Sequence, residues 1–115
     1  FRFAGEAAWP VGDFGSSFRL ARLLRSQTGE VRVDVAFLAP GDCVGAHRAG
    51  LPQLFCVISG SGWVQGGDGS EFAISGGEAA YWASGEWHAT RTDHGLTAVI
   101  VQAEALDPAA SLVAI

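Results

Sequence analysis

The sequence contains no lysine, and its seven basic residues are arginines that are spread along the chain. The formal net charge is -5 at pH 7. Nucleic-acid-binding proteins attract phosphates through a basic patch, so this charge distribution argues against a nucleic-acid partner. The sequence also lacks the run of about 20 consecutive apolar residues that a helix needs to cross a bilayer. We therefore expect no membrane partner.

Cysteine is scarce. Cys43 and Cys56 are the only two, and they lack the CxxC spacing of a redox or zinc motif. The N-terminal residues do not combine a basic start, a hydrophobic segment and a small-residue cleavage site, as a signal peptide would. We therefore expect a soluble, cytoplasmic protein whose cysteines stay reduced and pack as small hydrophobic residues.

Several common catalytic motifs are missing as well. No serine lies in a GxSxG turn, and no glycine-rich loop fits a phosphate or a dinucleotide. Neither cysteine is spaced to act as a nucleophile together with a histidine. The sequence therefore offers no sign of serine or cysteine hydrolase chemistry or of nucleotide binding.

Glycine, in contrast, is abundant, with 16 residues. Glycine-rich turns separate short strand-like segments at intervals of about eight to twelve residues, without a helical period between them. No repeat or linker interrupts the pattern, which predicts one all-β domain over residues 1–115, a sandwich or a small barrel. We expect an N-terminal edge segment at 1–17, a C-terminal tail at 104–115, and strands at 18–24, 31–38, 54–59, 63–65, 71–74, 79–82, 87–92 and 96–103.

Four local patterns lead to more detailed expectations. In segment 31–38 the odd positions are apolar while Arg32 and Asp34 are charged, which predicts a strand with its odd-numbered face in the core. Glycines at 60 and 62 between apolar runs predict a hairpin turn. Residues 40–60 begin as an irregular polar segment that looks like a loop, and they close on a strand-like apolar run. Asp107 and Pro108 favour a helical turn before an apolar tail, which we expect to cover a sheet edge or a partner chain.

The first of two histidine segments has a distinctive spacing. Five residues separate Gly41 from His47, and one residue separates His47 from Ala49. Three residues then separate Ala49 from Gln53, and six separate Gln53 from Gly60. This order resembles the first motif of the cupin superfamily, in which a His-x-His pair and a glutamate lie between two glycines.

The second segment resembles the second cupin motif. Gly77 is followed after five residues by Ala83-Ser84-Gly85, where the family has Pro-x-Gly, then by His88 and by Thr92 in place of asparagine. The resemblance covers about half of the chain. It implies an all-β, cupin-type double-stranded β-helix (jelly-roll) forming a small barrel, and by family habit a homodimer.

The resemblance also implies a metal site with fewer protein ligands than the family usually has. Family members usually have four protein ligands, whereas this sequence has Ala49 in place of the second histidine and Gln53 in place of the glutamate. The implied ligands are His47, Gln53 and His88, holding a divalent transition metal such as zinc, nickel, iron or copper. A neutral amide oxygen is a weaker ligand than a carboxylate, so we expect a lower affinity. If both strand faces point inward, the three side chains meet in the barrel.

Two further polar residues have alternative roles. Glu86 could complete a two-His-one-carboxylate site, but a glutamate in a turn is more often solvated. His94 follows Asp93 at a turn tip, which normally faces water. Among the aromatic residues, the adjacent Tyr81 and Trp82 cannot both face the cavity, because neighbours on a strand point to opposite faces.

Three functions fit these patterns. The first is a metal-dependent enzyme, of oxygenase or isomerase type, that acts on a small organic molecule. The second is a metal-free cupin that binds a small ligand without turning it over, as a sensor or sequestering domain. The third is a barrel that serves as a dimerisation module. Gln53 is the sequence feature that distinguishes the first two functions, because it is neutral where the family has a negatively charged glutamate that binds the metal.

Overall fold

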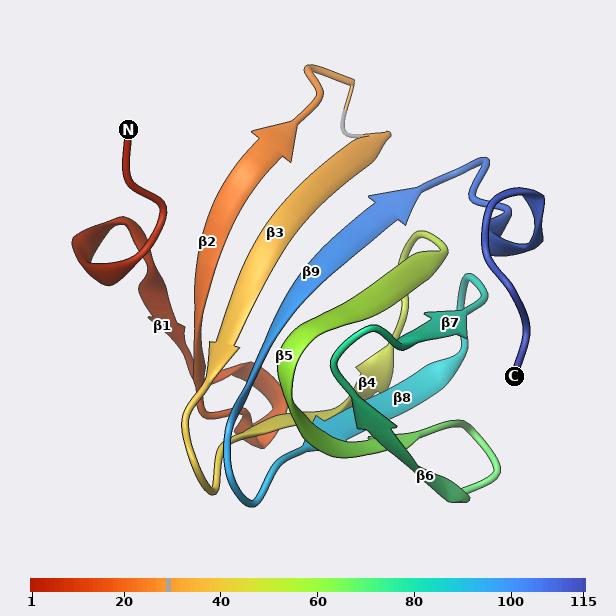
Figure 1. The fold of residues 1–115 in the computed structure, drawn as a ribbon. Coiled ribbons are helices and arrows are strands. Elements are labelled where there is room, and N and C mark those ends of the chain that lie inside the picture. The colour runs from red at the N-terminus through yellow and green to blue at the C-terminus, as the bar shows by residue number, and fades with distance from the viewer. Residues whose placement is uncertain (29) are drawn as a thin grey trace.

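The computed structural model describes residues 1–28 and 30–115 (Figure 1). In this part of the chain, nine strands form one antiparallel sheet in the order β1-β2-β3-β9-β5-β8-β4, with β6 and β7 also paired to β5. The all-β prediction is confirmed. The strands are β1 (Trp9–Val11), β2 (Phe18–Arg25), β3 (Val31–Leu38), β4 (Cys43–Arg48), β5 (Gln53–Gln65), β6 (Glu71–Ser75), β7 (Ala79–Trp82), β8 (Trp87–Arg91) and β9 (Leu96–Ala103).

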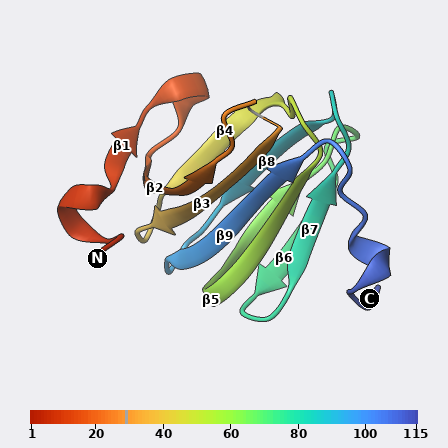
Figure 2. The same ribbon diagram turned by 90° about the horizontal axis from the view of Figure 1, so that it is seen from above.

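Strand β5 joins the two halves of the curled sheet, as Figures 1 and 2 show. Its first part pairs with β7 and β9, and its second part pairs with β6 and β8. The predicted hairpin at 60–62 is therefore wrong. Gly60 has a φ of 81°, and a Cβ at Gly60 or Gly62 would overlap the backbone of the neighbouring strands. The two glycines let a continuous strand bend from one half-sheet into the other.

The apolar core gathers side chains from both halves of the sheet. Phe55 and Val57 of β5 are its largest fully buried members. The other members of the cluster come from β2, β3, β6, β7, β9 and the second part of β5, together with Ala49, which follows β4. The curled sheet therefore encloses one hydrophobic interior, as the jelly-roll prediction requires.

The predicted orientation of β3 is wrong. Ala36 and Leu38 belong to the core cluster, so the even-numbered face points inward and takes Asp34 with it, which is 2% exposed. The outer face is covered too, because Phe3 of the N-terminal segment stacks on Phe37 with ring centroids 6.3 Å apart. Both faces of β3 are thus buried in part, and alternation alone did not reveal which one is the inside.

Residues 43–48 form the edge strand β4, where the sequence predicted an irregular loop. β4 pairs with β8, with an irregularity between Val44 and His47. It has no clear apolar alternation, which explains why the pattern missed it. Near the N-terminus, β1 pairs with β2 as an edge strand. Near the C-terminus, the predicted helical turn is present as the 3-10 turn Pro108–Ala110.

The apolar tail after this turn does not cover a sheet edge. Val113 and Ile115 are 90% and 100% exposed, and Figures 1 and 2 show the C-terminus beside the sheet. The other helical elements of the described residues are two three-residue 3-10 turns, Gly5–Ala7 and Asp13–Gly15. No helix in the described part of the chain is long and apolar enough to cross a membrane.

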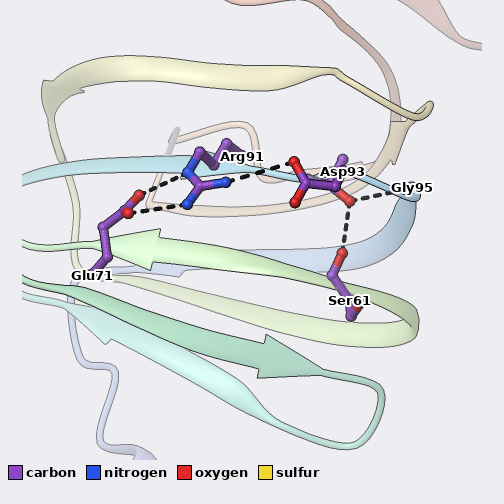
Figure 3. A network of polar contacts seen from close by, with 6 residues as sticks. Ser61, Glu71, Arg91, Asp93 and Gly95 are labelled. Atoms are coloured by element: carbon purple, nitrogen blue, oxygen red, sulfur yellow. Dashed lines mark hydrogen bonds and ion pairs between the residues drawn. The ribbon is translucent and has the colours of Figure 1, made fainter.

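Thr92 fastens the turn between β8 and β9 to β5. Its hydroxyl donates to the carbonyl oxygen of Ser61 at 2.6 Å and accepts from the amide of Gly95 at 2.9 Å (Figure 3). The neighbouring Arg91 forms a two-pronged pair with Glu71, which lowers the pKa of that carboxyl group through the hydrogen bond and the opposite charge. The Arg91 pair is exposed, whereas the Thr92 side chain is buried and its partners depend on it.

We predict that Thr92→Val lowers the free energy of unfolding by about 1–3 kcal/mol, because two backbone groups lose their partner in a buried place. Urea denaturation followed by tryptophan fluorescence measures the change. Thr97→Val is the matched control, since the Thr97 hydroxyl makes no hydrogen bond to any described residue. Equal stability of the two variants would contradict this role of Thr92.

Candidate functional site

His47 and His88 lie directly opposite each other on neighbouring strands. β4 and β8 are antiparallel, and their register pairs these two residues. The ring centroids are 4.3 Å apart, and the ring planes are inclined by 59°. The pairing thus brings the two histidine segments together across about forty residues of sequence.

Each imidazole is anchored through the same ring nitrogen. The Nδ1 of His47 donates to the carbonyl oxygen of Gly45 at 2.8 Å, and the Nδ1 of His88 donates to that of Glu86 at 3.3 Å. A carbonyl oxygen can only accept, so Nδ1 carries the hydrogen and Nε2 keeps a free lone pair. Histidines that bind metals are commonly held in this way.

The Nε2 atom of His88 is buried without a hydrogen-bond partner in the described residues. Burial lowers the pKa of this ring, and a positive charge on His47 would lower it further, although the Glu86 carbonyl opposes both effects. The ring is therefore neutral at pH 7, which is the form that binds metals.

Aromatic rings cover both histidines. Trp82 of β7 stacks on His88 with centroids 4.5 Å apart, and Phe14 stacks on His47 at 4.9 Å with planes inclined by 9°. Trp82 is buried and Tyr81 is 41% exposed, which confirms that these neighbours face opposite sides. The sequence interpretation missed Phe14. A signal was present in Gly45, because a glycine within a strand often marks the close approach of another segment.

Gln53 reaches the same place from the other half of the sheet. It begins β5, is 8% exposed, and pairs in register with Trp82 of β7 and Gln102 of β9. Its side-chain amide makes no hydrogen bond to the described residues. Gln53 and His88 thus both adjoin Trp82, one as its strand neighbour and the other as its stacking partner.

The remaining candidates lie elsewhere or have structural roles. Glu86 uses its carboxylate to accept from the amide of Ala83 at 3.0 Å, so it holds the turn instead of completing a ligand set. Its backbone oxygen orients His88 and accepts from the amide of Ala49. Ala49 is buried in the core, and His94 is exposed.

The surface has two hollows. One, of about 490 Å³, is lined by Trp82 and Glu86 among others, and the second, of about 440 Å³, includes Trp63 and His94. Neither is lined by His47 or His88. Among the described residues, no group of three or more histidine, cysteine or acidic side chains could hold a metal. The histidine pair is therefore not joined by a histidine, cysteine or acidic side chain of the described residues as a third ligand.

Comparison with solved structures identifies the architecture. A predicted oxalate decarboxylase from Thermotoga maritima superposes with a TM-score of 0.76 and 22% identity, over 87% of this chain and 94% of that one. A Cupin 2 conserved barrel domain protein from Salinispora arenicola matches with a TM-score of 0.68 and 20% identity, over 84% and 82% of the chains. The chain has the cupin fold.

The chain also resembles a DMSP lyase, with a TM-score of 0.67 and 20% identity over 81% of this chain and 50% of the lyase. No protein-family model and no curated protein matches the sequence. The expectation drawn from the two glycine-spaced motifs is thus confirmed at the level of the fold. At these identities the neighbours establish architecture and not activity.

We predict that Gly45→Ala displaces the 3-10 turn Asp13–Gly15, because a Cβ at Gly45 would overlap the carbonyl oxygen of Phe14. The free energy of unfolding should fall by about 1–3 kcal/mol. The ring protons of His47, measured by NMR, should lose the shift caused by the stacked phenyl ring. Gly50→Ala is the control, since a Cβ there meets open space. Unchanged His47 shifts in Gly45→Ala would refute this packing.

Proposed function

We propose that this cupin binds a divalent transition metal through His47, Gln53 and His88, and acts on or binds a small organic molecule at that metal. The observation that carries the proposal is the buried Nε2 of His88, which has no partner in the described residues. A buried acceptor left unpaired costs about 1–3 kcal/mol. A metal ion would satisfy this atom.

The donor set fits such an ion. Both histidines are anchored by Nδ1, which leaves their Nε2 lone pairs for a metal. Imidazole suits zinc, nickel, iron and copper, whereas magnesium and calcium prefer several oxygen ligands. Three protein ligands leave positions for water or substrate. Once bound, the ion would supply Lewis-acid or oxygen-activating chemistry.

An enzyme of oxygenase or isomerase type is one form of this proposal. The names of two structural neighbours, a predicted oxalate decarboxylase and a DMSP lyase, support a reaction on a small organic molecule. The alternative is a metal-free cupin that binds a small ligand as a sensor. The packing of Ala49 in the core favours that alternative, since it removes one donor that the family motif would supply.

We predict that protein purified without chelator contains close to one transition-metal ion per chain. His47→Ala and His88→Ala should each reduce the metal content about tenfold or more, because each removes one of two strong ligands. Elemental analysis by mass spectrometry measures the content. His94→Ala is the matched control, since that histidine is exposed and lines a different hollow. A low metal content that His88→Ala leaves unchanged would favour the metal-free alternative.

We predict that Gln53→Glu tightens metal binding by about tenfold or more, because a carboxylate adds a negative charge beside the cation. Competition with a fluorescent chelator measures the affinity. Gln27→Glu makes the same charge change in an exposed turn and should have little effect. Equal or weaker binding by Gln53→Glu would remove Gln53 from the ligand set.

A further inference from the structure

The inner face of the first half-sheet changes from apolar to polar along its strands. Towards one end it carries core residues, and towards the other it carries polar ones with the same strand parity. On β9 the polar residue Gln102 follows the core residue Ile100, and on the antiparallel β5 the polar residue Gln53 precedes the core residue Phe55. At the polar end the register aligns one row of neighbours: Arg32, Gln102, Gln53 and Trp82.

This row leads from Arg32 to the histidines. Arg32 of β3 faces Gln102 of β9, which faces Gln53 of β5, and Gln53 faces Trp82 of β7. Trp82 in turn stacks on His88. Figure 1 shows the start of β3 beside the end of β9, which agrees with this register. The row therefore lies at the end of the barrel where the proposed metal ligands are.

Arg32 supplies an uncompensated positive charge in this row. It is half-buried, its guanidinium donates to the side-chain oxygen of Gln102 at 2.7 Å, and it has no carboxylate partner in the described residues. The neighbouring Arg22 differs, because the buried Asp34 neutralises it at 2.6 Å. The chain as a whole carries a net charge of -5. Arg25 of β2 is the register partner of Arg32 on its other side, so the nearest strand neighbour adds positive charge. An anion would supply the partner that this half-buried guanidinium lacks among the described residues.

The groups around Arg32 suit a carboxylate. Gln102 uses its amide oxygen to accept from Arg32, so its NH₂ group is left as a donor. Gln53 is 8% exposed as a residue, and its amide makes no hydrogen bond to the described residues. A planar guanidinium matches a planar carboxylate in a two-pronged pair.

We propose that Arg32, assisted by Gln102, binds a carboxylate group of the small organic ligand, whose remaining part lies towards His47 and His88. This inference rests on the proposed function, because it names the ligand class of the same site. The ligand is therefore a small organic acid. Arg32 orients it by charge and by geometry.

Calorimetric titration with malonate, the neutral malonamide and inorganic phosphate tests the inference on zinc-loaded and on metal-free protein. Malonate should bind about tenfold or more tightly than either other probe. Arg32→Gln should weaken malonate binding about tenfold without changing the zinc content. Arg91→Gln makes the same charge change on the outer surface, at the exposed pair with Glu71, and should leave malonate binding unchanged.

A second measurement needs no variant. Malonate should shift the Nε–Hε NMR signal of Arg32 in the wild-type protein and leave that of Arg91 in place. The inference is overturned if Arg32→Gln binds malonate like the wild type, if phosphate or malonamide binds as tightly, if malonate does not bind at millimolar concentration, or if the Arg32 signal does not move.

The two proposals fail in different ways. If the protein retains no zinc but metal-free protein binds malonate through Arg32, the metal site is refuted and the carboxylate site stands. If zinc is retained through His47 and His88 but malonate binding does not depend on Arg32, the carboxylate site alone is refuted.

Discussion

The bend in β5 is the constraint on which the rest of the structure depends. The strand gives its first residues to one half of the sheet and its last residues to the other, so its two ends serve opposite walls of the barrel. The close packing at Gly60 and Gly62 leaves no room for side chains there. Without this bend, Gln53 on one wall and His88 on the other would not adjoin the same indole ring.

The strands themselves were largely predictable, because glycine-rich turns delimit them and apolar residues fill them. The bend of β5 at residues 60–62 was not predictable. Glycines that permit a chain reversal also permit a bend within a strand, and which of the two forms depends on the strands that lie alongside. The sequence pattern also did not predict strand β4. It is an edge strand that pairs with β8 alone in the described residues, so little of it is buried and no alternation develops.

The candidate site shows where sequence reasoning succeeds and where it stops. The meeting of His47 and His88 could be expected from the spacing of their two motifs. The stacking of Phe14 could not, since it depends on how the N-terminal segment crosses β4. Arg32 was assigned to the outside because alternation shows that a strand has two faces but not which one is inside. Ala36 and Leu38 lie in the core, so the even-numbered face that carries Arg32 is the inner one, and Phe3 covers part of the outer face.

Trp82 gives this barrel an internal optical reporter. It is 3% exposed, whereas Trp9, Trp63 and Trp87 are 36% exposed or more. Its indole therefore accounts for the short-wavelength part of the emission spectrum, since a buried indole is shielded from water. Because the ring lies against His88, an open-shell ion such as copper or nickel at that imidazole would quench this component selectively. Binding of the proposed metal would thus be followed in solution without any added dye.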